Sequence, residues 1–236
     1  YLGRLEDHLE GRGIGFKYVR PHVLGSWLPD DLEPISAVFI MGGGPWGAAG
    51  LKNLPILDEE ITFIKNCLAK KIPVTGFGLG AQVLCLAAGG SSEPADLSFD
   101  VTQIERSVDK ALNGYLPESF PAAIYMRDRP VPPQSASIFA QDENGNPAVF
   151  QIGENCFGFT GHPGIKVGMI EDLIMEFDDI PDGTSETLAR LRGAQTEMED
   201  ALVYIMTGLV QMMGLMQRQK LGHNLDAMDT SSDCAA

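Results

Sequence analysis

The 236 residues fit one α/β domain with helical additions, and a hydrophobic content of 44% can fill a large core. The formal net charge of -15 makes nucleic acid and anionic membrane surfaces poor partners, because both repel an acidic chain. No apolar run approaches the roughly 20 residues of a membrane-spanning helix, so no membrane insertion is expected.

The first half of the chain alternates strand and helix patterns. The apolar run 37–41 is continuous, which is typical of a buried parallel strand. The expected elements are a helix around Leu2 to Leu9 that stops at glycines 11, 13 and 15, strands over 16–19, 37–41 and 72–75, and helices over 57–70 and 82–88. This alternation predicts a doubly wound, mostly parallel sheet.

From about residue 98 the pattern changes to short strands separated by Gly, Pro and Asn turns, which predicts an antiparallel extension of the sheet. The expected elements are strands over 98–104, 122–126, 137–140, 148–152 and 156–160, followed by helices over 166–177, 185–193 and 196–219. We expect a single domain over 1–221, including the C-terminal helices 185–219. The polar tail 222–236 is predicted to be disordered.

The cysteines do not indicate a metal site or a disulfide framework. They stand at 67, 85, 156 and 234 without a C-x-x-C pair. A reducing compartment, the cytoplasm or an organelle interior, is therefore favoured. No metal or other cofactor is expected. Cys85 lies between two leucines of a predicted helix, which indicates core packing rather than a displaced nucleophile.

Residues 73–82 read as a strand, a tight turn of small residues and a helix. Hydrolases use such a turn to expose a nucleophile beside a helix N-terminus. Here the tip of the turn is Gly78, which has no side chain to present. We interpret this glycine as relieving backbone strain, in preference to a role in close approach of a ligand.

The order and spacing of four short segments resemble those of the class I glutamine amidotransferase family, particularly stand-alone proteins related to the GMP synthase glutaminase domain. They are 43–47 (GGPWG), 76–82 with 89–90 (GFGLGAQ, GG), 116–121 with 132–133 (LPESFP, PP) and 159–164 (FTGHPG). The resemblance covers about residues 2–217. It implies an amidotransferase-like α/β fold. The family also has a strand before the first helix, which here is missing or lies upstream.

The resemblance places the catalytic cysteine at Gly78, the histidine at His162 and the orienting glutamate at Gly164. Only the histidine is present, so these are vestigial positions and no catalytic residue is assigned. The family's histidine-rich motif aligns with 124–128, where only Asp128 matches. We interpret His162 as a hydrogen-bonded relic rather than a working base. Restoring activity would then need Gly78→Cys together with Gly164→Glu.

The first hypothesis is therefore a pseudoenzyme, a structural or regulatory subunit with protein partners in a larger assembly or homo-oligomer. An alternative is a small-molecule module for glutamine-like or carboxylate ligands, with Gly43, Gly44, Leu79 and Gln82 as candidate binding residues. A less favoured alternative is a hydrolase or amidotransferase with altered chemistry that uses His162 with Asp128 or with an incoming residue. The methionines between 198 and 216 follow helical spacing, which favours core packing over a partner surface.

Overall fold

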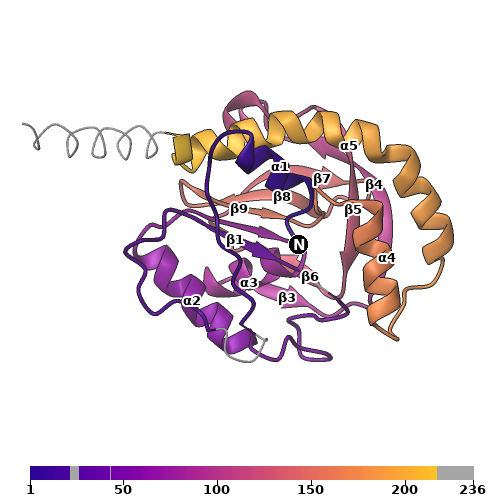
Figure 1. Cartoon of the computed structure of the whole chain (residues 1–236), viewed down its shortest axis with the longest axis horizontal. Coiled ribbons are helices and arrows are strands. Elements are labelled where there is room, and N and C mark those ends of the chain that lie inside the picture. Colours follow the sequence, from indigo (N-terminus) through magenta and orange to yellow (C-terminus); the bar gives the residue numbers. More distant parts are fainter. Residues whose placement is uncertain (22–26, 43, 217–236) are drawn as a thin grey trace, which may run out of the picture.

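The computed structural model describes residues 1–21, 27–42 and 44–216. A seven-stranded mixed sheet forms its centre, with the order β1-β2-β9-β8-β7-β4-β5 (Figure 1). Its strands are β1 (Val38–Met41), β2 (Val74–Phe77), β4 (Ser98–Arg106), β5 (Ser119–Met126), β7 (Ser137–Asp142), β8 (Pro147–Ile152) and β9 (Cys156–Phe159). The predicted end of the domain at 221 and the tail 222–236 lie outside the described residues.

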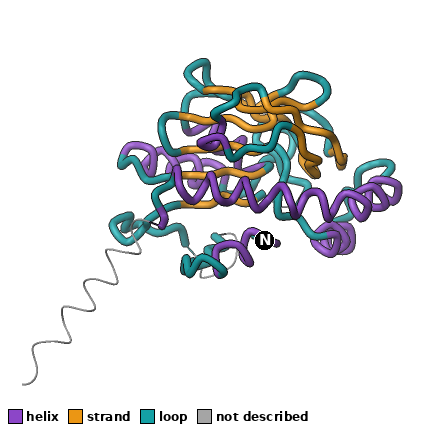
Figure 2. Tube along the Cα trace, turned by 90° about the horizontal axis from the view of Figure 1, so that it is seen from above, coloured by secondary structure: helices purple, strands orange, loops and turns teal. Residues whose placement is uncertain are grey.

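Helices cover both faces of the parallel part of the sheet, which confirms the doubly wound α/β class. Alternate side chains of β1 belong to different cores: Phe39 and Met41 pack with α1 and α5, whereas Val38 and Ile40 pack with α2 and α3. In the view from above, the long α5 runs beside the strands (Figure 2). The helices are α1 (Arg4–Glu10), α2 (Leu57–Ala69), α3 (Leu79–Ala87), α4 (Val167–Glu176) and α5 (Thr184–Met212), with a 3₁₀ turn η1 (Ala111–Gly114).

The antiparallel extension is larger than the sequence indicated. Only β1, β2 and β9 pair in parallel among the described strands, and the four pairings from β9 through β8, β7 and β4 to β5 are antiparallel. The sheet is therefore mixed rather than mostly parallel. A separate two-stranded sheet, β3 (Ser91–Glu93) with β6 (Arg129–Val131), was not predicted.

Three further expectations are wrong. Residues 16–19 form no strand, because they have no ladder to join, and Phe16, Tyr18 and Val19 are partly exposed. The strand over 37–41 exists, but it is half-buried at an edge of the described sheet rather than fully buried. The two helices expected over 185–193 and 196–219 are one continuous helix, α5, that ends at Met212.

The core-packing interpretations of the cysteines and methionines agree with the structure. Cys67, Cys85 and Cys156 are buried free thiols. Met198, Met206 and Met213 are buried in the cores around α5 and Met212 is partly buried, whereas Met216 is 42% exposed and does not fit the prediction. None of the helices in the described ranges combines the length and the apolar character needed to span a lipid bilayer.

Candidate functional site

The turn at Gly78 has the geometry of a nucleophile-bearing elbow. β2 ends at Phe77 and α3 begins at Leu79, so Gly78 is the single residue between them. Its φ of 56° and ψ of -118° lie in a region that side-chain-bearing residues rarely adopt. Its N–H donates to the Phe159 carbonyl at 2.9 Å, which fixes the turn against the end of β9.

The neighbouring glycines serve a different purpose. A Cβ at Gly80 would collide with the Ile40 carbonyl, and one at Gly76 would collide with the Gly80 carbonyl, so both allow α3 to pack closely on the sheet. A Cβ at Gly78 would have the Thr160 carbonyl oxygen as its nearest neighbour, 4.0 Å away. The turn therefore keeps room for a side chain, and only the backbone conformation favours glycine there.

His162 follows β9 and lies beside this turn. Its N–H donates to the Ala123 carbonyl at 3.0 Å, and its ring stacks on Phe77 with centroids 5.8 Å apart. The Gly164 N–H donates to Nδ1 at 3.1 Å, and Nε2 lies 3.0 Å from the Tyr1 carbonyl oxygen. A backbone N–H only donates and a carbonyl only accepts, so Nδ1 is unprotonated and Nε2 carries the proton.

This tautomer is the reverse of the one in the Ser-His-Asp triad. In a triad, the orienting carboxylate accepts from Nδ1–H and the nucleophile's proton passes to Nε2. Here Nε2 already donates to the protein's own backbone, so its lone pair is not offered to an incoming group. Burial lowers the pKa of His162 to about 4, which keeps the ring neutral at pH 7.

The position of the expected glutamate is filled by the start of the chain. Arg4 N–H donates to the Gly164 carbonyl at 2.8 Å. A Cβ at Gly164 would lie 2.8 Å from the Leu5 nitrogen and 3.0 Å from Leu5 Cγ. Backbone this close cannot move aside cheaply, so the structure has no room for a glutamate at this position.

The four candidate binding residues differ in the groups that they could present to a ligand. Gly43 lies outside the described residues. Gly44 has a φ of 63°, and the Phe177 ring packs against it at a distance that leaves no room for a Cβ. Leu79 is the first residue of α3, where its N–H has no intrahelical acceptor.

Gln82, the fourth candidate, is buried with both ends of its amide already engaged. Nε2 donates to the Arg127 carbonyl at 2.7 Å, and Oε1 accepts from the Ser92 hydroxyl at 3.0 Å. These contacts join α3 to the β5–β6 turn and to β3. They give Gln82 a structural role in this arrangement.

Asp128 is also engaged away from His162. Its buried carboxylate accepts from the N–H groups of Ala48 and Ala49 at 2.9 Å each and from that of Ala95 at 3.1 Å. Its backbone has a φ of 60°, a conformation that Asp tolerates better than most residues. Asp128 therefore fixes the loop after the glycine segment, and the expectation that it pairs with His162 is not met.

An ion-pair cluster beside the glycine loop has no counterpart in the sequence-based expectations. Asp179, after α4, accepts from Lys52 Nζ at 3.1 Å and from Arg127 at 2.7 Å. Arg127 also donates to the Pro45 carbonyl at 2.9 Å. These residues are about 50 to 130 positions apart in sequence, so neither local spacing nor periodicity reveals the cluster.

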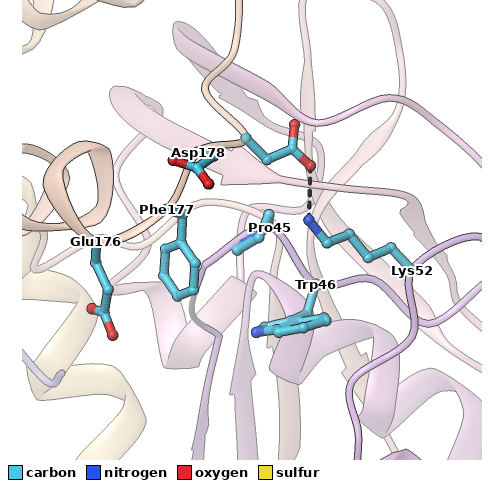
Figure 3. A pocket seen from close by; sticks show the side chains of 7 residues that line it. Pro45, Trp46, Lys52, Glu176, Phe177 and Asp178 are labelled. Atoms are coloured by element: carbon cyan, nitrogen blue, oxygen red, sulfur yellow. Dashed lines mark hydrogen bonds and ion pairs between the residues drawn. The ribbon is translucent and has the colours of Figure 1, made fainter.

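Two cavities lie near these residues, and neither is lined by Gly78 or His162. One of about 460 Å³ lies between the loop that contains Trp46 and the segment after α4 (Figure 3). The other, lined in part by Thr160 and Pro163, is about 10 Å³, which is about the space of one water molecule. Across the described ranges, no three His, Cys, Asp or Glu side chains gather as a metal ion would require.

No protein-family model and no curated protein matches this sequence. Solved structures do match its fold. A glutamine amidotransferase from Thermotoga maritima aligns with a TM-score of 0.76 at 22% identity, covering 90% of this chain and 92% of that one. A glutamine amidotransferase from Methylobacillus flagellatus aligns with a TM-score of 0.75 at 18% identity, covering 90% of both chains. The chain therefore has a class I glutamine amidotransferase-like fold.

Proposed function

We propose that this chain is a catalytically inactive glutamine amidotransferase-like protein that acts as a structural or regulatory subunit of a larger protein assembly. The observation that carries the proposal is the state of His162. The residues that would have to flank it as nucleophile and orienting carboxylate are Gly78 and Gly164. Both nitrogens of its ring are bonded to the protein's own backbone instead.

The chemistry of amide hydrolysis explains why these features matter. The thiol route forms a covalent acyl-enzyme, which needs a nucleophile at the elbow and a base that can accept its proton. Gly78 supplies no nucleophile. With Nε2–H donating to the Tyr1 carbonyl and Nδ1 accepting from the Gly164 N–H, neither ring nitrogen of His162 has a free lone pair. Removal of the nucleophile leaves at most the residual catalysis of binding and oxyanion stabilisation.

The assembly half of the proposal is supported by what the chain keeps. A fold that is kept without catalytic residues serves as a binding surface for other proteins in this proposal, although a fold alone does not define a function. Large apolar side chains are exposed on α5 and on the loop before β1: Tyr204 is 56% exposed, Val203 48% and Trp27 82%. The charge of -15 favours protein partners with basic surfaces over nucleic acid. The buried free thiols favour a reducing compartment.

The test has two independent measurements. The first is ammonia release from glutamine by the purified chain, compared with His162→Ala. We expect no difference between them and no release above buffer, and release that requires His162 would overturn the inactive assignment. The second is native mass spectrometry of the endogenous protein, where we expect a stoichiometric complex. A free monomer would contradict the subunit role, but it would not affect the conclusion from the ammonia-release measurement.

A second function, binding of a small glutamine-like or carboxylate ligand at the old catalytic position, is favoured by one observation. A Cβ at Gly78 would have the Thr160 carbonyl oxygen as its nearest neighbour, 4.0 Å away, and the Leu79 N–H at the start of α3 faces no intrahelical acceptor. Thermal-shift measurements with glutamine, glutamate and nucleotides test it. No shift at millimolar ligand would dismiss this alternative.

A further inference from the structure

The 460 Å³ cavity beside the glycine loop is in the size range of small-molecule sites. Trp46 and Phe177 give it aromatic surface, and the Lys52–Asp179 ion pair closes one side (Figure 3). Since neither Gly78 nor His162 lines it, the cavity is distinct from the old catalytic position.

The walls of the cavity are held in place by contacts from several segments. Asp179 is fixed by Lys52 and Arg127, and the hydrogen bond from Lys52 is the main reason why the pKa of Asp179 is lowered. Phe177 is held against Gly44, as described above. A site with fixed walls needs little reorganisation on binding, which favours affinity.

The charge of the lining selects for a cation. Three acidic residues, Glu176, Asp178 and Asp179, line the cavity together with one basic residue, Lys52. Asp179 is committed to its two basic partners, whereas Glu176 and Asp178 have no ion-pair partner within the described part of the chain. The field of a chain with a charge of -15 adds to the attraction for cations and repels anions.

The aromatic surface selects for a cation with an apolar body. Lys52 Nζ lies 5.4 Å from the centroid of the Trp46 ring, within the range of a cation–π contact. Lys52 therefore already occupies a cation–π position at Trp46, so a ligand would place its alkyl chain, and not its charge, against the indole. A guanidinium or ammonium group carried on an alkyl chain matches an aromatic surface bordered by unpaired carboxylates.

We propose that this cavity binds a small organic cation, an alkylguanidine or alkylamine, with its alkyl chain against Trp46 and Phe177 and its charge near Glu176 and Asp178. The inference does not rest on the proposed function, because it concerns a different cavity and is tested on the isolated chain.

The probe is agmatine, which carries both an ammonium and a guanidinium group on a four-carbon chain. The sequence contains two tryptophans, at 27 and 46, so Trp27→Phe leaves Trp46 as the single fluorescent indole. We expect agmatine to change its fluorescence saturably, and isothermal titration calorimetry to give the same dissociation constant. Saturation that is absent up to about 10 mM agmatine would overturn the proposal.

Two variants measure the two parts of the site by calorimetry. Trp46→Leu should weaken agmatine binding by about 3- to 10-fold, through loss of the aromatic surface against its alkyl chain. Glu176→Gln combined with Asp178→Asn should weaken it by about 3- to 10-fold and reduce its salt dependence. The matched control, Glu197→Gln with Asp200→Asn, removes the same two charges from the exposed face of α5 and should leave the affinity within about 2-fold.

Ligand controls separate charge from shape. N-butylurea has a similar chain without a charge and should bind at least about 10-fold more weakly than agmatine, and glutarate should not bind. Equal binding of N-butylurea, or an affinity for agmatine that both sets of cavity substitutions leave unchanged, would show that the cavity does not recognise cations.

Discussion

Gly78 and Gly164 stand at the positions where the family resemblance places a nucleophile and an orienting carboxylate, and their surroundings differ. A Cβ at Gly78 would meet only the Thr160 carbonyl oxygen, at 4.0 Å, and the turn keeps its strained dihedral angles. A Cβ at Gly164 would lie 2.8 Å from the Leu5 nitrogen, because the start of α1 packs directly onto this residue. The structure therefore has room for a Cβ at Gly78, whereas atoms of Leu5 fill the space that a Cβ would need at Gly164.

This difference shows which of the two expected side chains the fold would accommodate. The elbow persists because Gly76 and Gly80 are needed for α3 to pack on the sheet, independently of chemistry. The histidine loop has become part of the packing between β9 and α1, with Arg4 bonded to Gly164 and the Tyr1 carbonyl bonded to His162. Restoring the nucleophile is therefore structurally simple, whereas restoring the carboxylate requires α1 to move.

The largest expected effect is that of Gly164→Glu on stability. The substitution forces a side chain into backbone and buries an unpaired carboxylate, so we expect a loss of about 4 kcal/mol in the free energy of unfolding, measured with urea. Gly168→Glu is the matched control, because a Cβ there meets nothing within 4 Å. It should change stability by less than about 0.5 kcal/mol. Equal losses in the two variants would remove the distinction between a filled and an open position.

The next effect is a pH dependence from His162. Its pKa is about 4 in the folded chain and about 6.5 when unfolded, so between these values the unfolded state binds more protons. The contribution to stability is therefore fully present above pH 6.5 and is lost as the pH falls towards 4, by at most about 3 kcal/mol. The difference in unfolding free energy between the natural chain and His162→Phe, followed from pH 7 to pH 4, isolates this contribution. A difference that stays constant with pH would contradict the burial of a neutral ring.

A smaller effect is expected at the elbow. Gly78→Ala should lose about 2 kcal/mol, because alanine must adopt a φ of 56° with a ψ of -118°. Gly183→Ala is the control, since Gly183 has a φ of 70° and a ψ of 10°, in the left-handed helical region that alanine enters at a cost of about 1 kcal/mol. If Gly78→Ala cost no more than the control, the elbow would not store backbone strain.

The smallest effect concerns the reactivity of a thiol introduced by Gly78→Cys. With His162 neutral and its Nε2–H donated elsewhere, we expect the pH profile of alkylation by iodoacetamide to show an ordinary thiol with a pKa of about 8.5. The rate should change less than about 2-fold when His162→Ala is added. A lowered thiol pKa that depends on His162 would show that a nucleophile–base pair still forms.

The sequence predicts those parts of this molecule that depend on local patterns. The apolar runs and the Gly76–Gly80 spacing predict the order of β2, the elbow and α3, because periodicity and turn chemistry act over a few residues. The predicted bounds are shifted: the strand expected over 72–75 is Val74–Phe77, and the helix expected over 82–88 is Leu79–Ala87. The strand expected over 16–19 fails because β propensity is realised only where a partner strand exists. The break expected near Gly193 fails because one glycine costs a helix only about 1 kcal/mol, which packing of the neighbouring turns outweighs.

The site is predictable to a similar extent. The family resemblance groups Gly78, His162 and Gly164 as one expected constellation, but it carries no information on which residues contact these positions. The contact from Tyr1 to His162 spans 161 residues, and Asp128 bonds to amides about 80 residues earlier. Such long-range polar contacts follow from the packing of α1 and β5 in three dimensions, which only the structure supplies.

The central claim is that the protein is catalytically inactive, and it rests on hydrogen bonds that engage both nitrogens of the His162 ring with the backbone. The protonation of this ring tests the claim most directly. Nitrogen-15 NMR of the imidazole in the purified protein distinguishes the two tautomers and follows the titration. We predict a proton on Nε2 at pH 7 and a ring that stays neutral until the pH approaches 4. A proton on Nδ1 at pH 7, or a titration near pH 6.5, would show a histidine free to act as a base and would contradict the claim.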